Sequence, residues 1–217
     1  MIKAVIFDLD GVLLQSEEVW DEVREQLARN TGGKWHSMAS RDMMGMSSPE
    51  WSRYMSEELG LPMTPNEINQ EVVRGMEAAY SAHLPLISGA QEAVQRMAAR
   101  WPLGLASSSN RQLIDRALRE AELSDLFQAT VSSEEVDRGK PHPDVFQEVA
   151  RQLKVEPGHA AAIEDSHNGV RSAHAAGMAV VLIPNAAFPP REEASALAGA
   201  ILGELSELTV ELIDGMD

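Results

Sequence analysis

The first hydrophobic run of the chain, Ala4–Phe7, does not alternate with polar residues. This pattern is typical of a strand that is buried on both faces. Between residues 15 and 84 apolar side chains recur every three or four positions, which predicts helices and no strand. The expected helices cover residues 16–29, part of 43–59, and 65–80. Gly45 and Pro49 interrupt the middle segment, which predicts two short helices or a loop and a helix there.

From residue 86 onward, short apolar runs alternate with amphipathic segments. Strands are expected at 103–106, 129–131, 160–163 and 179–183, with a short edge strand at 200–202. Helices are expected at 90–97, 110–121, 142–153, 168–176 and 206–213, and a loop at 184–190. Such alternation predicts a parallel, doubly wound sheet. We therefore expect an α/β fold with a Rossmann-like core (1–14 and 85–217) and a small all-α cap (15–84) inserted after the first strand.

Composition narrows the class of protein. The 217 residues leave room for one domain and a small second one, and 44% hydrophobic with 24% charged residues is ordinary for a soluble protein. No apolar run approaches the roughly 18 residues that cross a membrane, and the first residues do not resemble a signal peptide. The absence of cysteine excludes disulfides, thiolate metal sites and a cysteine nucleophile. We expect a cytoplasmic protein.

The formal charge of −16 changes the expected partners. Nucleic acids and anionic membranes require clustered lysine and arginine, so neither is expected as a partner. An anionic substrate would need a bound divalent cation and a few local positive charges. A monomer is the expected oligomeric state.

Chemically reactive side chains follow several of the predicted strands or precede a helix. They are Asp8 and Asp10 after the first strand, the serines at 107–109 after the second, Glu164 and Asp165 after a later one, and Lys140 in a loop before a helix. Parallel strands bring their carboxyl ends to one edge of a sheet, where α/β proteins bind ligands. These groups can therefore converge although they are far apart in the sequence.

The residue types limit the chemistry of such a cluster. Asp8 and Asp10 by themselves suggest a metal site or an acid/base pair, because two close carboxylates repel each other. Oxygen ligands without histidine or cysteine suit Mg²⁺, and serine hydroxyls at a helix start suit a phosphate. Lys140 adds a positive charge, and an aspartate can form an aspartyl-phosphate. Together they indicate phosphoryl transfer through aspartate, with Mg²⁺ neutralising the repulsion between anions.

These blocks resemble the four motifs of the haloacid dehalogenase superfamily, specifically its phosphatases with a small helical cap. The motifs are Asp8-Leu9-Asp10-Gly11-Val12, Ser107 after a strand, Lys140 in Gly-Lys-Pro-His-Pro-Asp, and Ile163-Glu164-Asp165-Ser166-His167-Asn168-Gly169. Their order and spacing match, and the resemblance covers nearly the whole chain.

The resemblance implies a role for each site residue. Asp8 would be the nucleophile, and Asp10 the general acid and then the base. Ser107 and Lys140 would hold the phosphoryl group, with Ser108 beside them as a capping or backbone donor. The Mg²⁺ ligands would be Asp8, the backbone carbonyl of Asp10, Asp165, and Glu164 directly or through water. The cap would close over the site and select a small phosphorylated metabolite.

Within this superfamily, β-phosphoglucomutases carry a cap histidine and a cap arginine where this chain has Trp20 and Ser48. The segment around Trp20 instead resembles sugar-phosphate phosphatases, although Gln15 replaces their usual aspartate. We expect a Mg²⁺-dependent phosphatase of small phosphomonoesters, such as sugar or polyol phosphates. A phosphosugar mutase and a non-enzymatic phosphosugar-binding protein stay open. Ser16 is expected to cap the first helix, and Trp20 and Trp51 are expected in the core.

Overall fold

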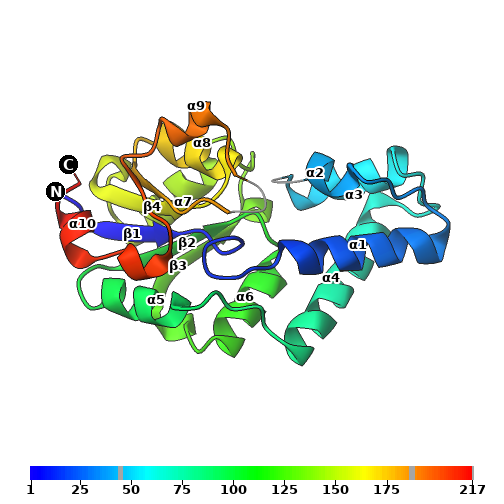
Figure 1. Ribbon diagram of the computed structural model, residues 1–217, viewed down its shortest axis with the longest axis horizontal. Coiled ribbons are helices and arrows are strands. Elements are labelled where there is room, and N and C mark those ends of the chain that lie inside the picture. Colours follow the sequence, from blue (N-terminus) through cyan, green and yellow to red (C-terminus); the bar gives the residue numbers. More distant parts are fainter. Residues whose placement is uncertain (44–45, 186–188, 217) are drawn as a thin grey trace.

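The computed structural model describes residues 1–43, 46–185 and 189–216, and within them a parallel sheet forms the centre of the molecule (Figure 1). Its strand order is β3-β2-β1-β4-β5-β6, and every neighbouring pair runs parallel. The strands are β1 (Ala4–Phe7), β2 (Leu103–Ser107), β3 (Phe127–Ser132), β4 (Ala160–Glu164), β5 (Ala179–Leu182) and β6 (Ala200–Ile201). The predicted strands are thus confirmed, with boundaries that move by a residue or two.

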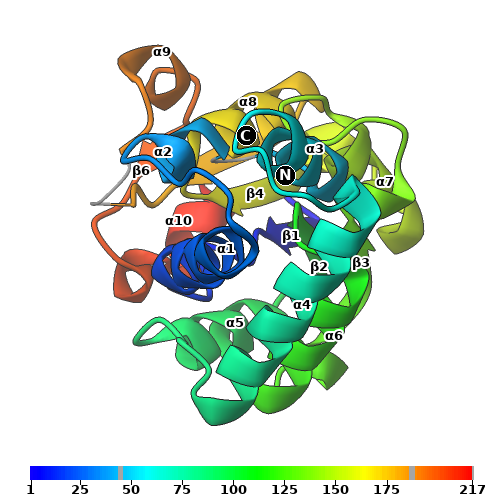
Figure 2. The ribbon, with the colours of Figure 1, turned by 90° about the vertical axis from the view of Figure 1, so that its right-hand side faces the viewer.

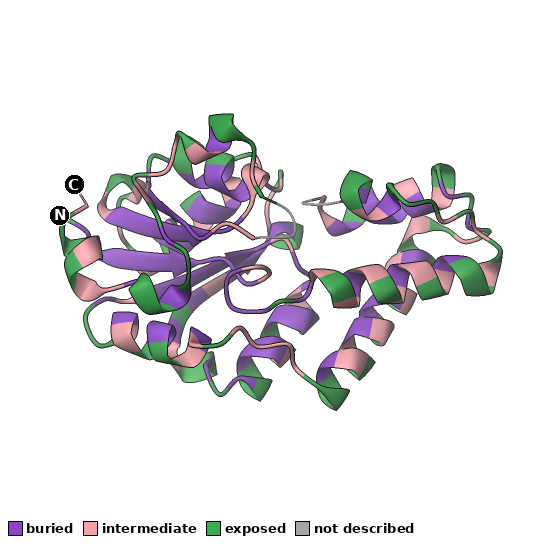
Figure 3. Ribbon diagram, in the orientation of Figure 1, coloured by how far each residue is buried: buried purple, intermediate pink, exposed green. Residues whose placement is uncertain are grey.

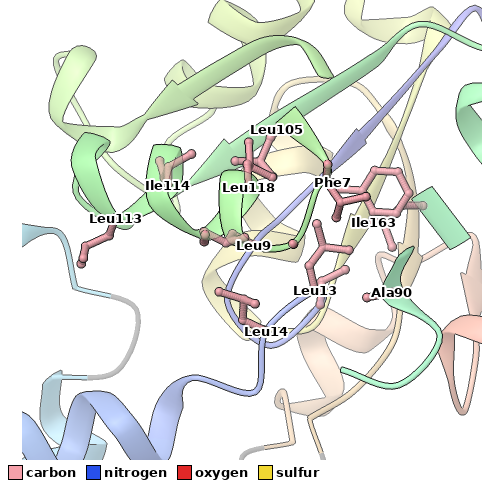
Figure 4. Packing of buried hydrophobic residues seen from close by; sticks show 14 of the residues in the cluster. Phe7, Leu9, Leu13, Leu14, Ala90, Leu105, Leu113, Ile114, Leu118 and Ile163 are labelled. Atoms are coloured by element: carbon pink, nitrogen blue, oxygen red, sulfur yellow. The ribbon is translucent and has the colours of Figure 1, made fainter. Parts of the chain in front are cut away.

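Helices cover both faces of the sheet because successive side chains of each strand point to opposite sides. Val5 and Phe7 of β1 pack on the side of α5 (Ala90–Ala98), α6 (Arg111–Glu120) and α10 (Val210–Asp214). Ala4 and Ile6 pack on the side of α7 (Asp144–Leu153), α8 (His167–Ala175) and α9 (Glu192–Ser195). Figure 4 shows Phe7, Ile163 and Leu105 together with Leu118 of α6. Strands β1 to β5 are buried almost throughout (Figure 3), so the predicted doubly wound α/β fold is confirmed.

The described residues between β1 and the rest of the core form four helices. They are α1 (Glu17–Thr31), α2 (Ala39–Met43), α3 (Ser48–Glu57) and α4 (Pro65–Ala82). They lie beyond one end of the sheet in Figure 1 and therefore in front of it in the end-on view of Figure 2. Ile68, Val72 and Met76 of α4 are fully buried, one turn apart, as the helical period predicts. The helix α1 ends at Gly32, whose φ of 84° is the left-handed conformation that glycine adopts readily.

The chain enters and leaves this helical segment side by side. Leu14 forms a bridge with Leu86, the Gln15 N–H donates to the Pro85 carbonyl at 2.8 Å, and the Ile87 N–H donates to Leu13 at 2.9 Å. The two linkers therefore form one narrow connection. The exact domain boundaries, 14/15 and 84/85, stay predictions.

The structure corrects one predicted element. The expected helix at 206–213 is a 3₁₀ turn, Leu205–Glu207, followed by α10, because the Thr209 hydroxyl accepts a hydrogen bond from the Leu212 N–H and starts a new helix. Residues 44–45 and 186–188 of two predicted segments lie outside the described residues. Among the helices described, none has the length and apolar character that a membrane crossing requires.

Gly104 of β2 tests the packing of α7 on the sheet. A Cβ at this position would lie 2.2 Å from Cγ1 of Val149, so Gly104→Ala should destabilise the fold by about 1–3 kcal/mol through overpacking. Urea unfolding measures this change. In Gly158→Ala, the matched control, the nearest atom to the new Cβ is 3.8 Å away, so stability should hardly change. Equal stability of the two variants would contradict the packing described.

Candidate active site

The carboxyl ends of β1 and β4 place the first and fourth motifs side by side. The Asp8 N–H donates to the Ile163 carbonyl at 3.0 Å and thereby extends the pairing of the two strands. Gly11 then turns the chain with a φ of 82°. A Cβ on Gly11 would lie 1.9 Å from Oδ2 of Asp165, so the absence of a side chain there makes room for this carboxylate.

Lys140 joins these two motifs from its own loop. Its Nζ forms an ion pair with Oδ1 of Asp8 at 2.9 Å and donates to Oε1 of Glu164 at 2.6 Å. Glu164 is completely buried, and its second oxygen accepts from the backbone N–H of Asp165 at 3.0 Å and from the Ser166 hydroxyl at 3.1 Å. Both oxygens of Glu164 are therefore occupied by protein donors, and this residue positions Lys140.

Burial governs the titration of this cluster. Burial raises the pKa of Asp8, Lys140 opposes that shift, and the charge of Glu164 adds to it. Burial, followed by the charges of Glu164 and Asp8, raises the pKa of Asp165 well above its usual value. Burial alone would lower the pKa of Lys140, but Asp8 and Glu164 outweigh it and raise that pKa, so the ammonium stays charged. Full ionisation of the three carboxylates would therefore leave the cluster with an excess of negative charge.

A divalent cation fits this excess. Asp8, Glu164 and Asp165 each present an oxygen within 4.8 Å of the others, and Oδ1 of Asp165 is buried without a hydrogen-bond partner. When all three carboxylates are ionised, one ammonium leaves two negative charges uncompensated. Carboxylate oxygens are also the ligands that Mg²⁺ prefers. The residues present thus suit Mg²⁺, as the sequence predicts.

Asp10 is held between the sheet and the helical segment. Its Oδ1 accepts from the Ser16 hydroxyl and from Nε1 of Trp20 at 3.3 Å. Its Oδ2 accepts from the Ser109 hydroxyl at 2.6 Å and, at 3.5 Å, from that of Ser107. Donors from α1 and from the segment after β2 therefore meet on one carboxylate.

A cavity of about 780 Å³ extends from the cluster into the helical segment. Its walls on the sheet side include Asp8, Asp10, Ser108, Ser109, Lys140 and Asp165. Its walls on the helical side include Glu17, Trp20, Arg24, Arg41, Met43 and Trp51. A ligand there would contact the carboxylates and the helical segment at once.

The structure brings all seven predicted site residues to one edge of the sheet. Ser107 and Glu164 are fully buried and lie behind the wall of the cavity, whereas Ser108 forms part of it. The functional roles of these residues stay predictions.

Three residues beside the site make contacts that the sequence does not predict. Ser16 is the N-cap residue of α1, as expected, but its hydroxyl donates to Asp10 and makes no capping hydrogen bond to the helix. Trp20 is buried as expected and also contacts Asp10. Arg24 lines the cavity although nothing in the sequence distinguishes it from the other charged residues of α1.

Asp165→Asn tests the acidic cluster. Because burial raises the Asp165 pKa, its ionised form opposes folding at neutral pH, so the variant should melt higher than the wild type in EDTA. The wild type should gain about 3 kcal/mol of stability at a Mg²⁺ concentration 100 times the dissociation constant, and the variant much less. Thermal unfolding measures both effects. The exposed control Asp125→Asn should behave as the wild type, and an unchanged Mg²⁺ effect in Asp165→Asn would count against the site.

Glu17 tests the electrostatics of the cavity wall. Burial raises its pKa from 4.5 to about 7. In the unfolded chain this side chain ionises at lower pH than in the folded protein. Its ionisation therefore lowers the free energy of unfolding increasingly from pH 4.5 to 7, and by the full amount above pH 7. Glu17→Gln should therefore stabilise the protein by about 1–2 kcal/mol at pH 8, given its partial exposure, and much less at pH 5. Thermal unfolding at both pH values would show this, and the exposed Glu18→Gln should show no such difference.

Comparison with known proteins gives relatives that match this arrangement. A family model described as haloacid dehalogenase-like hydrolase matches residues 5–183. Hexitol phosphatase B from Escherichia coli (strain K12) is 30% identical over 218 residues, which cover 97% of this chain and 96% of that protein. The phosphorylated carbohydrates phosphatase of Thermotoga maritima is 30% identical over 179 residues, 82% of each. The bifunctional riboflavin kinase/FMN phosphatase of Arabidopsis thaliana is 29% identical, and the chain spans 55% of its length.

Solved structures share the fold over nearly the whole chain. CbbY from Rhodobacter sphaeroides in complex with phosphate superposes with a TM-score of 0.86 at 24% identity, covering 99% of this chain and 100% of that one. A HAD family hydrolase from Deinococcus radiodurans R1 with bound phosphate and sodium superposes with a TM-score of 0.70 at 26% identity, covering 98% of this chain and 96% of that one. The chain belongs to the haloacid dehalogenase-like hydrolase family and, within it, to the phosphoric monoester hydrolases.

Proposed function

We propose that this protein hydrolyses small phosphomonoesters, with sugar or polyol phosphates as the substrate class, through an aspartyl-phosphate on Asp8 and with Mg²⁺ as cofactor. The observation that carries the proposal is the convergence of Asp8, Asp10, Lys140 and Asp165 on one cavity. Hexitol phosphatase B and the phosphorylated carbohydrates phosphatase support the substrate class, because their names describe phosphate esters of polyols and carbohydrates.

In this proposal Asp8 attacks phosphorus while the bond to the leaving oxygen breaks. Asp10 donates a proton to that oxygen and so releases the alcohol. Asp10 then takes a proton from a water molecule that attacks the aspartyl-phosphate, the bond between phosphorus and Asp8 breaks, and inorganic phosphate leaves. Lys140 supports the first step because its ammonium, 2.9 Å from Oδ1, favours the ionised form of Asp8.

The phosphoryl oxygens would be held by Lys140 and by the segment after β2. Ser108 faces the cavity, and Ser107, behind it, accepts a hydrogen bond from the Ser109 N–H at 3.0 Å and fixes the turn. The metal would be held by Asp8, Asp165 and the backbone carbonyl of Asp10, with Glu164 nearby. When bound, Mg²⁺ supplies positive charge that offsets the repulsion between the carboxylates and the phosphate.

The helical segment would act as a cap. We propose that residues 15–84 close over the cavity, exclude water and contact the leaving group, since Trp20, Arg24 and Trp51 line its far side. The narrow double linker at Leu14 and Leu86 suits movement of the segment as a unit.

A hydrolase is favoured over a mutase by the residue next to Asp10. Trp20 donates its indole N–H to this carboxylate at 3.3 Å. An indole nitrogen has no lone pair to accept a proton, whereas the histidine of the mutases can exchange one. Incubation with β-glucose 1-phosphate separates the two activities, because a hydrolase releases phosphate and a mutase forms the isomeric ester.

Asp8→Asn tests the nucleophile. It should lower the turnover of p-nitrophenyl phosphate in Mg²⁺ by a factor of at least about 10³, because an amide is a poor nucleophile. Phosphate release measures this loss, and circular dichroism verifies the fold. The exposed control Asp125→Asn should keep full activity, and an active Asp8→Asn would refute the assignment.

A further inference from the structure

Arg24 of α1 is a buried cation in the wall of the cavity. Its side chain is 8% exposed. The guanidinium carbon lies 4.6 Å from the ring centre of Trp20 and 4.8 Å from that of Trp51. The two indole rings, 6.1 Å apart and tilted by 60°, form a corner in which the guanidinium sits. These contacts cover its faces and leave the N–H groups at its edge as donors.

No described residue forms a hydrogen bond or an ion pair with the guanidinium of Arg24, and its Nε is buried without a partner. Two other arginines of the helical segment do form ion pairs, because Arg29 and Arg74 pair with glutamates of their own helices. Burial lowers the pKa of Arg24 to about 10 although Asp21 and Asp10 act against this, so the group is charged at neutral pH and incompletely compensated. A buried charge without a partner costs free energy unless a ligand supplies the counter-charge.

Arg24 also lies where a leaving group would extend. The indole of Trp20 contacts both Arg24 and Asp10, the proposed general acid. Its N–H donates to Asp10 at 3.3 Å, and the guanidinium of Arg24 lies over its ring. Asp8 and Lys140 line the same cavity of about 780 Å³ from the sheet side, and Arg24 lines it from the helical segment. A substrate whose phosphate meets Asp8 would therefore direct its far end toward Arg24.

We propose that Arg24 binds a second anionic group on the substrate, a carboxylate or a second phosphate at the end of the leaving group away from the transferred phosphate. The proposal rests on the phosphatase function proposed above and restricts its substrates to phosphate esters that carry a second anionic group. The planar edge of a guanidinium suits two oxygens of one anion. A neutral hydroxyl would leave the buried charge incompletely compensated. In a protein of net charge −16, a second anion on a substrate requires such a local cation.

The test compares matched substrates. Sorbitol 6-phosphate and 6-phosphogluconate differ only at the carbon farthest from the phosphate, which is an alcohol in one and a carboxylate in the other. The wild type should show a kcat/KM about tenfold or more higher for 6-phosphogluconate. In a second pair, fructose 6-phosphate and fructose 1,6-bisphosphate, a higher kcat/KM for the bisphosphate would show that a second phosphate is bound. Preference in the first pair identifies a carboxylate as the ligand, preference in the second identifies a phosphate, and preference in neither overturns the proposal.

Arg24→Met keeps an apolar stem against the two indoles and removes the charge. It should reduce the preference for the acidic member of the pair to about one, and Arg24→Lys should retain part of it. The exposed Arg53→Met, on α3 of the same segment, removes one positive charge outside the cavity wall and should leave the preference intact. A preference that survives in Arg24→Met, with its melting temperature unchanged, would refute the role of Arg24.

Binding to Asp8→Asn separates this proposal from the proposed function. Because Arg24 contacts both Trp20 and Trp51, 6-phosphogluconate or the bisphosphate should change tryptophan fluorescence in Asp8→Asn, and the added Arg24→Met should weaken that binding about tenfold. Such binding without turnover of any ester in the wild type would refute the phosphatase and support the anion site. Turnover of p-nitrophenyl phosphate without selectivity in either pair would support the phosphatase and overturn the anion site.

Discussion

Three carboxylates buried within 4.8 Å of one another require positive charge beside them, and this constraint shapes the edge of the sheet. Lys140 supplies part of that charge and bonds to both Asp8 and Glu164. Glycines stand where the carboxylates need space, since a Cβ on Gly11 or Gly169 would overlap a carboxylate group. The strands on which the cluster stands are held by two buried cores, so their packing can offset the electrostatic cost of the site.

Asp10 links this edge to the helical segment. Ser109 holds it from the core, Ser16 and Trp20 hold it from α1, and Trp20 in turn contacts Arg24. The contacts form one series from the sheet to the cap. A displacement of α1 relative to the sheet would remove two donors from Asp10, so the position of the cap and the environment of this carboxylate are linked.

Periodicity predicts most of the fold because burial on one face or both is a local property of the sequence. The run Ala4–Phe7 is apolar throughout since helices cover both sides of β1. The prediction is wrong at 206–213, where a local hydrogen bond at Thr209 divides an amphipathic pattern that looks continuous. The convergence of the site could be predicted because parallel strands end at one edge. The roles of Ser16 and Arg24 could not, since a serine before a helix usually caps it and a single arginine carries no pattern.

The sequence by itself determined the order of strands and helices, the motif residues and the kind of chemistry they support, because each depends on residue type and spacing. Only the tertiary structure decided which oxygen each donor reaches, that Ser107 and Glu164 lie behind the cavity wall, and that Arg24 lines the cavity with no ion pair to any described residue. The physical reason is that burial and electrostatic pairing depend on the distance between elements far apart in the chain. The identity of a leaving group is governed by those distances, whereas the reaction at phosphorus is governed by the residues of the motifs.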